Sequence, residues 1–234
     1  MKVFIALCML LAVASAIRLD LKTHQPLQIT VLTESLCPNC REFITNSYAR
    51  AIQAEGIELL ANITIVPFGN TKEVKKDDHF EYTCQHGEKE CQGNMLQSCL
   101  FAHVDKKRAE RMLVCVDSKI TAVDGDWLKA FNDCGDELKI DLKKTLYCAH
   151  SKEGNALMHR TALKSDPSHQ YVPWIIVNGK HDVGVESKII EDLVGYACSQ
   201  YTGKVPVPAC QAEASKKQIT LGKLKTLLEK LEKH

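Results

Sequence analysis

Two cysteines that are separated by two residues are the feature of this chain most suited to chemistry. Cys37 and Cys40 lie in the segment ESLCPNCREF, residues 34–43. A pair with this spacing can be a redox centre, half of a zinc site or a structural crosslink. A cysteine directly before a helix lies near the positive end of the helix dipole, which stabilises the reactive thiolate. We therefore expect a redox pair, positioned by a strand before it and a helix after it.

The two alternatives fit the sequence less well. Structural zinc normally needs two closely spaced pairs of ligands, but the sequence has a single C-x-x-C pair, and its nine histidines form no HxxxH-type cluster. We therefore predict no metal site. A structural disulfide between Cys37 and Cys40 would close a very short loop and remove little entropy from the unfolded chain. It stays the alternative to an active pair.

The two sulfur atoms are predicted to have different roles. Cys37 is expected to be the more exposed nucleophile, and Cys40, one helical turn inward, the resolving thiol. An ordinary cysteine is only about 0.03% ionised near pH 5, so a reductase of an acidic compartment must lower the pKa of its nucleophile. Pro173 precedes a predicted strand, where a cis peptide bond would hold backbone beside the pair for an extended substrate. The sequence alone does not determine the isomer.

The N-terminal segment and the cysteine count indicate a protein of the secretory pathway. Residues 1–16, MKVFIALCMLLAVASA, have the pattern of a signal peptide, and their removal leaves ten cysteines in a compartment that permits disulfides. No later segment is long and apolar enough to span a bilayer, and the balance of 30 Lys+Arg against 29 Asp+Glu gives no support to nucleic-acid binding. Asn62 begins an N-glycosylation sequon, so we predict a glycan there, which requires an exposed strand end or edge.

The pattern of apolar residues predicts the elements that position the cysteine pair. Strands are expected at 27–33 and 57–67, with a helix over 41–56 between them. A strand at 174–177, a hairpin turn at Asn178-Gly179 and a helix over 186–200 complete this core.

Between these two halves, residues 70–165 are charged and rich in cysteine, and we predict that they form a helical insertion crosslinked by disulfides. We expect structural roles for eight cysteines whose pairing the sequence leaves open: Cys84, Cys91, Cys99, Cys115, Cys134, Cys148, Cys198 and Cys210. Residues 201–234 read as a linker and an amphipathic helix with Leu221, Leu224, Leu228 and Leu231 on one face. This tail is expected either to dock on the domain or to be a removable pro-segment or surface-binding helix.

The order of these elements resembles an α/β thioredoxin-like domain that carries an insertion. A second motif narrows the resemblance: CQHGEKECQGNMLQSC, residues 84–99, matches the C-Q-H-G-x2-E-C-x2-N-x4-C signature of the gamma-interferon-inducible lysosomal thiol reductase (GILT) family. The resemblance extends over residues 27–200. It implies a soluble glycoprotein of lysosomes or the extracellular space that reduces disulfides of protein substrates at acid pH.

The resemblance also implies roles for individual residues. Cys37 and Cys40 would be the active thiols, and Cys84, Cys91 and Cys99 would be structural. His86 and Glu90 of the signature are residue types suited to acid-base chemistry, but we expect His86 to have a structural role as a hydrogen-bonding residue. No dinucleotide-binding glycine motif occurs in the sequence, so we expect no bound cofactor and a small thiol as reductant. The oligomeric state is left open.

Two other functions fit the same sequence. One is a disulfide oxidase or isomerase that acts at neutral pH, which a measured redox potential would distinguish from a reductase. The other is a secreted binding or modulatory protein that keeps the scaffold but has little turnover. The intact C-x-x-C pair favours an enzyme over the binding protein.

Overall fold

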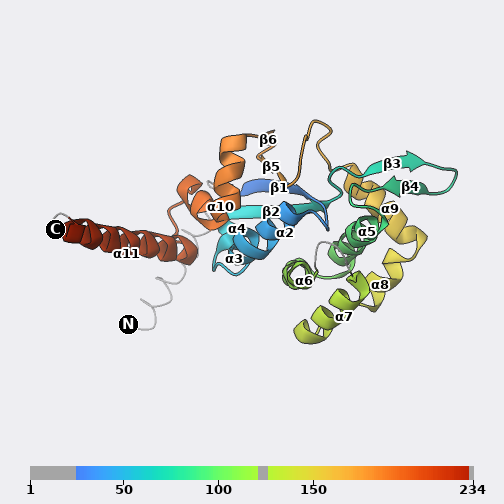
Figure 1. Ribbon diagram of the computed structural model, residues 1–234, viewed down its shortest axis with the longest axis horizontal. Helices are drawn as coiled ribbons and strands as arrows, with labels where there is room; N and C mark the ends of the chain where they lie inside the picture. The colour runs from blue at the N-terminus through green and yellow to red at the C-terminus, as the bar shows by residue number, and fades with distance from the viewer. Residues whose placement is uncertain (1–24, 121–125, 232–234) are drawn as a thin grey trace, which may run out of the picture.

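The computed structural model describes residues 25–120 and 126–231 (Figure 1). The predicted signal peptide, residues 1–16, lies outside this part of the chain. A mixed sheet with the strand order β2-β1-β5-β6 forms its centre. The four strands are β1 (Leu27–Thr33), β2 (Ala61–Pro67), β5 (Trp174–Val177) and β6 (Lys180–His181). β1 pairs in parallel with β2 and antiparallel with β5, so it is an inner strand of the sheet.

β1 leads directly into the helical segment that carries the cysteine pair. This segment consists of α2 (Pro38–Phe43), the π-helical turn η1 (Ile44–Tyr48) and α3 (Ala49–Ala51). The apolar stripe predicted from the sequence is buried, with Phe43, Ile44 and Tyr48 at most 1% exposed. The predicted helix over 41–56 is therefore present, but it ends earlier. Gly56 then has a left-handed backbone with φ of 86°, which a glycine adopts without steric cost.

The second strand is shorter than predicted. Residues 57–60 form a helical turn, α4 (Ile57–Leu60), and β2 begins at Ala61. The backbone N–H of Leu59 donates to the carbonyl of Gly56, which starts this turn directly after the left-handed residue. The apolar residues of the turn suit a buried helix as well as a strand, so their pattern alone did not distinguish the two.

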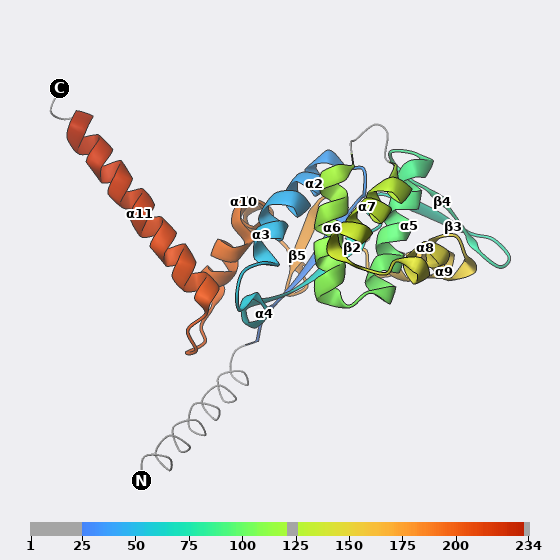
Figure 2. The same ribbon diagram turned by 90° about the horizontal axis from the view of Figure 1, so that it is seen from below.

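The insertion lies between β2 and β5 and is mainly helical, as predicted. Figure 2 shows its helices grouped at one end of the sheet. They are α5 (Glu88–His103), α6 (Lys106–Lys119), α7 (Trp127–Leu138), α8 (Lys143–Ala149) and α9 (Lys152–Ala162). The insertion also has a hairpin that the sequence analysis missed, made of β3 (Lys72–Lys75) and β4 (Phe80–Thr83).

All eight cysteines that were expected to be structural form disulfides within the described residues. The bonds join Cys84 to Cys91, Cys99 to Cys148, Cys115 to Cys134, and Cys198 to Cys210. Three of them lie inside the insertion, and the fourth ties the last helix of the core to the tail. Cys37 and Cys40 are the free thiols of the described chain.

The core continues beyond residue 200 into the segment expected to be a linker. α10 (Val183–Gln200) packs against η1 and β5, and α11 (Pro208–Leu231) follows it and projects from the body (Figure 1). Val207 and Ala209 are 2% and 6% exposed, and the N–H of Ala209 donates to the carbonyl of Glu55. Two residues of the stretch expected to be a linker are therefore packed against the core, while Pro206 and Pro208 are exposed. The side chains of the predicted leucine stripe lie outside the described part of α11.

No helix of the described part of the chain is both long and apolar enough to cross a membrane.

Candidate active site

The cysteine pair lies where β1 ends and α2 begins, as the sequence predicted. Cys37 is the N-cap of α2, and its Sγ accepts a hydrogen bond from the backbone N–H of Cys40 at 3.4 Å. Pro38 occupies the first turn of the helix, where the missing N–H of proline costs no hydrogen bond. The thiolate of Cys37 would therefore face the free N–H groups at the positive end of a helix.

The two thiols have different environments. Cys37 is 7% exposed and Cys40 is 0% exposed. The pKa of Cys37 is lowered to about 6, chiefly by a hydrogen bond from the Cys40 thiol, with further help from the backbone N–H groups of Cys40 and Asn39. Burial raises the pKa of Cys40 well above its ordinary value, and the same hydrogen bond to Cys37 adds to this effect. The environment of Cys37 therefore favours its thiolate, whereas that of Cys40 favours the protonated thiol.

Pro173 approaches the pair from the other half of the core. The Val172-Pro173 peptide bond is cis, and the carbonyl oxygen of Val172 is 3.7 Å from Cys37 Sγ. Pro173 therefore lies close to the cysteine pair, as predicted. A cleft of about 560 Å³ runs from Asn39 past Val172 and Pro173, with Glu42 and Glu186 also in its lining. Because Val172 lines this cleft and its carbonyl lies near Cys37 Sγ, the cleft opens close to the cysteine pair.

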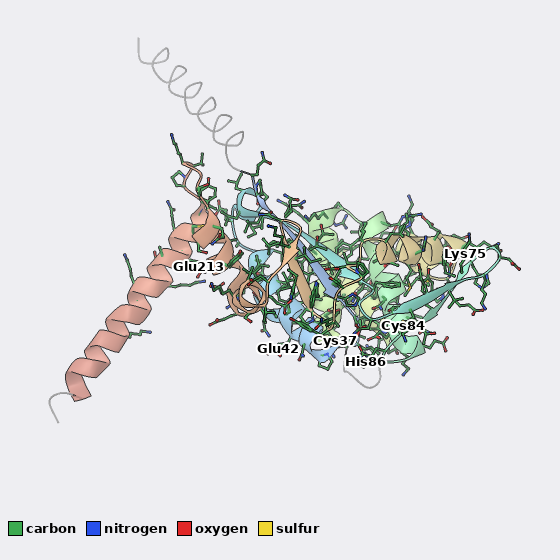
Figure 3. The ribbon with its side chains drawn as sticks, turned by 90° about the horizontal axis from the view of Figure 1, so that it is seen from above. Cys37, Glu42, Lys75, Cys84, His86 and Glu213 are labelled. Atoms are coloured by element: carbon green, nitrogen blue, oxygen red, sulfur yellow. A yellow bond between two sulfur atoms is a disulfide. The ribbon has the colours of Figure 1, made fainter. Side chains whose placement is uncertain are left out.

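The signature segment, residues 84–99, packs against the loop between β1 and the cysteine pair. The side-chain oxygen of Asn94 accepts from the backbone N–H of Ser35 at 2.9 Å, and Ser35 Oγ donates to the carbonyl of Glu90 at 3.0 Å. Ser35, Glu90 and Asn94 are all buried. The signature therefore holds the backbone that leads into Cys37, and its segment lies next to the cysteine pair (Figure 3).

His86 and Glu90 form a hydrogen-bonded pair, which fits the structural contact expected for them. Glu90 accepts from the backbone N–H of His86 at 3.0 Å, and its other oxygen is 2.6 Å from His86 Nδ1. Sequence reasoning missed the third member of this group: Glu34, whose Oε2 is 3.6 Å from His86 Nδ1 and whose side chain is fully buried. The only signal for Glu34 was an acidic residue between a buried strand and Cys37.

Two groups of three possible metal ligands occur among the described residues. In the first, His103, Cys148 and Glu153, the cysteine is already bonded to Cys99 and offers no thiolate. In the second, Glu34, His86 and Glu90, two of the donor atoms are 2.6 Å apart. Ligands at about 2.0–2.1 Å from a tetrahedral zinc ion are separated by roughly 3.3 Å. The second group therefore has the geometry of a hydrogen-bonded cluster and not that of a zinc site.

The predicted glycosylation site is sterically accessible. Asn62 is exposed on β2, which is an edge strand of the sheet, as a glycan would require. Its side-chain amide donates to Gln28 Oε1 at 3.0 Å and accepts from Lys106 Nζ at 2.7 Å. Both partners are side chains at the surface, and they can move away from a sugar.

Comparison with known proteins gives one consistent result. Residues 28–138 match the profile of the family described as "Gamma interferon inducible lysosomal thiol reductase (GILT)". The chain is 38% identical to the "Gamma-interferon-inducible lysosomal thiol reductase" of Carassius auratus over 195 residues, which cover 79% of this chain and 72% of the relative. It is 31% identical to the Mus musculus protein of the same name, with 81% and 73% covered. A "Gamma-interferon-responsive lysosomal thiol protein" of Arabidopsis thaliana is 32% identical, with 80% and 77% covered.

Proposed function

The chain belongs to the gamma-interferon-inducible lysosomal thiol reductase family, and we propose that it reduces disulfides of protein substrates with Cys37 as nucleophile and Cys40 as resolving thiol. The observation that carries this proposal is the asymmetry of the pair. Cys37 caps the helix, its pKa is lowered to about 6, and its Sγ lies near the carbonyl of Val172, a residue that lines the cleft. Cys40 is fully buried and its pKa is raised. An attacking thiolate and a waiting thiol need these two different environments.

The reaction proceeds by two exchanges. The Cys37 thiolate attacks one sulfur of the substrate, the substrate disulfide breaks, and the leaving thiolate takes a proton from the medium. Cys40 then loses its proton and attacks Cys37 Sγ, which breaks the mixed disulfide and releases the second substrate thiol. The substrate has gained two electrons, and Cys37 and Cys40 are oxidised to a disulfide. Two molecules of a small thiol return the pair to the reduced state and become a disulfide themselves.

The protein disulfide is proposed to reach Cys37 through the cleft beside Pro173. A carbonyl of the protein already lies near the sulfur, since Val172 O is 3.7 Å from Cys37 Sγ. Backbone at that place can pair with an extended substrate segment, which suits proteins that are partly unfolded. Such substrates occur in acidic degradative compartments, and we propose a lysosomal or extracellular site of action at acid pH.

Two substitutions test the assignment of roles. Cys37→Ser should abolish reduction of a protein disulfide, because a hydroxyl cannot replace the thiolate. Cys40→Ser should keep the first exchange and accumulate mixed disulfides with the substrate, visible on non-reducing gels and released by added thiol. The assay is run with purified protein and a small thiol at pH 4.5 and pH 7.

Each other outcome of this experiment has a definite meaning. If Cys37→Ser forms the adducts and Cys40→Ser does not, the two roles are reversed. If both variants reduce the substrate as fast as the unmodified chain, the pair is structural and the proposal fails. Faster turnover at pH 7 than at pH 4.5 would contradict the acid-pH part of the proposal.

A further inference from the structure

Three ionisable side chains, two of them buried, form a cluster beside the cysteine pair: Glu34, His86 and Glu90. His86 Nδ1 is 2.6 Å from Glu90 Oε2 and 3.6 Å from Glu34 Oε2. The side chains of Glu34 and Glu90 are 0% exposed, and that of His86 is 37% exposed. Glu34 Oε1 accepts from the N–H of Asn70, but the buried Oε2 has no hydrogen-bond partner among the described residues. It faces His86 instead.

The disulfide between Cys84 and Cys91 encloses two members of this cluster. His86 and Glu90 lie within the loop that this bond closes, and Figure 3 shows His86 and Cys84 next to Cys37. Gly87 within the loop has φ of 84°, which favours glycine. The loop therefore presents the imidazole to Glu34 from a fixed position.

The charge of this cluster changes with pH in a direction that favours the Cys37 thiolate. Burial, with the nearby Glu90 charge, raises the pKa of Glu34 to about 7, and the Cys37 thiolate contributes to this rise. Glu34 is therefore mostly neutral at the acid pH where Cys37 titrates. A protonated His86 lowers the pKa of Cys37. As the medium becomes acidic, Glu34 takes up a proton and Cys37 loses a negative neighbour.

Other charged groups around α2 have partners of their own. Arg41 of α2 donates to the backbone carbonyl of Asp117 on α6. Glu186 of α10 accepts from the N–H of Ile175 and from the hydroxyl of Tyr171. From the side of the signature, His86 and Glu90 face Glu34, and the Cys40 thiol lies beside that of Cys37.

We infer that Glu34, His86 and Glu90 are positioning residues that keep Cys37 nucleophilic in acid. The neutral carboxyl of Glu34 no longer repels the thiolate, the imidazolium of His86 attracts it, and Glu90 holds His86 through its ring and its backbone N–H. This inference rests on the proposed reductase and specifies the medium in which its site works. It also gives the signature of the family a physical task at the active site.

The test measures the ionisation of Cys37 without any substrate disulfide. The reduced full-length protein is alkylated with iodoacetamide between pH 4.5 and pH 8.5, and the modification of Cys37 is followed by mass spectrometry with fragmentation. His86→Gln should slow the alkylation at pH 5 by about threefold, the effect of roughly half a pKa unit, and should leave the rate at pH 8.5 nearly unchanged. His86→Lys keeps a positive charge and should restore the rate in acid.

Glu34→Gln examines the other half of the inference. It should remove the weaker second step that the ionisation of Glu34 adds to the alkylation curve near pH 7. His103→Gln is the matched control, since His103 lies at the other end of α5 and pairs with Glu153 at 3.1 Å. Its curve should superimpose on that of the unmodified chain.

Two results would overturn the inference. One is a His86→Gln curve identical to that of the unmodified chain. The other is a several-fold faster alkylation of Glu34→Gln at pH 5, which would mean that Glu34 stays charged in acid. If His86→Gln does not fold, His86→Lys and Glu34→Gln still decide. Because alkylation needs no turnover, a failure of the proposed reductase would leave these curves unaffected.

Discussion

Replacing Cys40 by alanine or by serine should separate the two tasks of this residue. The hydrogen bond from the Cys40 thiol is the largest cause that lowers the pKa of Cys37. Alanine removes this donor, whereas serine keeps an O–H group at nearly the same place. Both variants lose the thiol that we propose to resolve the mixed disulfide, so their difference reports only on the ionisation of Cys37. We expect the pKa of Cys37 to rise in Cys40→Ala and to stay low in Cys40→Ser.

The structure sets limits on the size of this effect. A cysteine with a pKa of about 6 is about 9% ionised at pH 5, whereas an ordinary cysteine with a pKa near 8.5 is about 0.03% ionised. The ratio of about 300 is the largest loss that the variant can suffer. The backbone N–H groups of Asn39 and Cys40 remain in Cys40→Ala, and they also lower the pKa of Cys37. We therefore expect alkylation at pH 5 to slow by about ten- to thirtyfold relative to Cys40→Ser.

The assay is alkylation of the single remaining active thiol from pH 4.5 to pH 9. The two variants should reach similar rates at pH 9, where the thiolate is fully formed in both. Superimposed curves for alanine and serine would refute the reasoning, because the side-chain donor would then have no effect on Cys37. A large difference that persists at pH 9 would indicate altered access to Cys37 and not altered ionisation.

Three further predictions concern parts of the chain outside the pair. Burial raises the pKa of Asp117 to about 8, so the folded protein holds a proton that the unfolded chain releases above about pH 4, and stability should fall as pH rises through this window. Asp117→Asn should therefore raise the free energy of unfolding in urea at pH 8, on the order of 1–3 kcal/mol, with little effect at pH 4. Truncation after residue 212 should leave the domain folded, whereas truncation after residue 206 removes buried Val207 and the Cys198–Cys210 bond and should cost about 3–5 kcal/mol. Treatment with an amide-cleaving glycosidase should lower the mass of the protein from a secretory host, and Asn62→Gln should show no such change.

The sequence predicted those elements whose pattern is local. β1 runs directly into the pair, and the Asn178-Gly179 turn has φ of 51° and 79°, the left-handed values that its two residues favour. The β3–β4 hairpin was missed because its strands are short, charged and mostly exposed. Its stability depends on a distant residue, since the side chain of Asn155 bonds both the N–H and the carbonyl of Phe80. No local pattern can reveal a contact between residues 75 positions apart.

At the site, too, the sequence revealed the local features and missed the contacts between residues that are distant in the chain. The spacing of Cys37 and Cys40 and the position of Pro173 are local signals, and the structure brings these residues together. Glu34 was not identified, because its importance comes from His86, which is distant in sequence and close in space. Asn94 is a fixed residue of the signature, so the sequence marked it as important. The sequence did not indicate that its hydrogen-bond partner is Ser35.

The four disulfides of the described residues differ in the length of the loop that each closes, from 7 to 49 residues. The bond between Cys99 and Cys148 spans 49 residues and joins α5 to α8, so it removes substantial entropy from the unfolded chain. The bond between Cys84 and Cys91 spans only 7 residues and restricts the unfolded chain much less. A weak contribution to global stability is consistent with a local task, because this short loop carries His86 and Glu90 to the buried carboxyl of Glu34. In our proposal, the signature of the family therefore describes a support for the cysteine pair: a short crosslinked loop with one histidine and one glutamate, followed by an asparagine that binds the backbone next to Cys37.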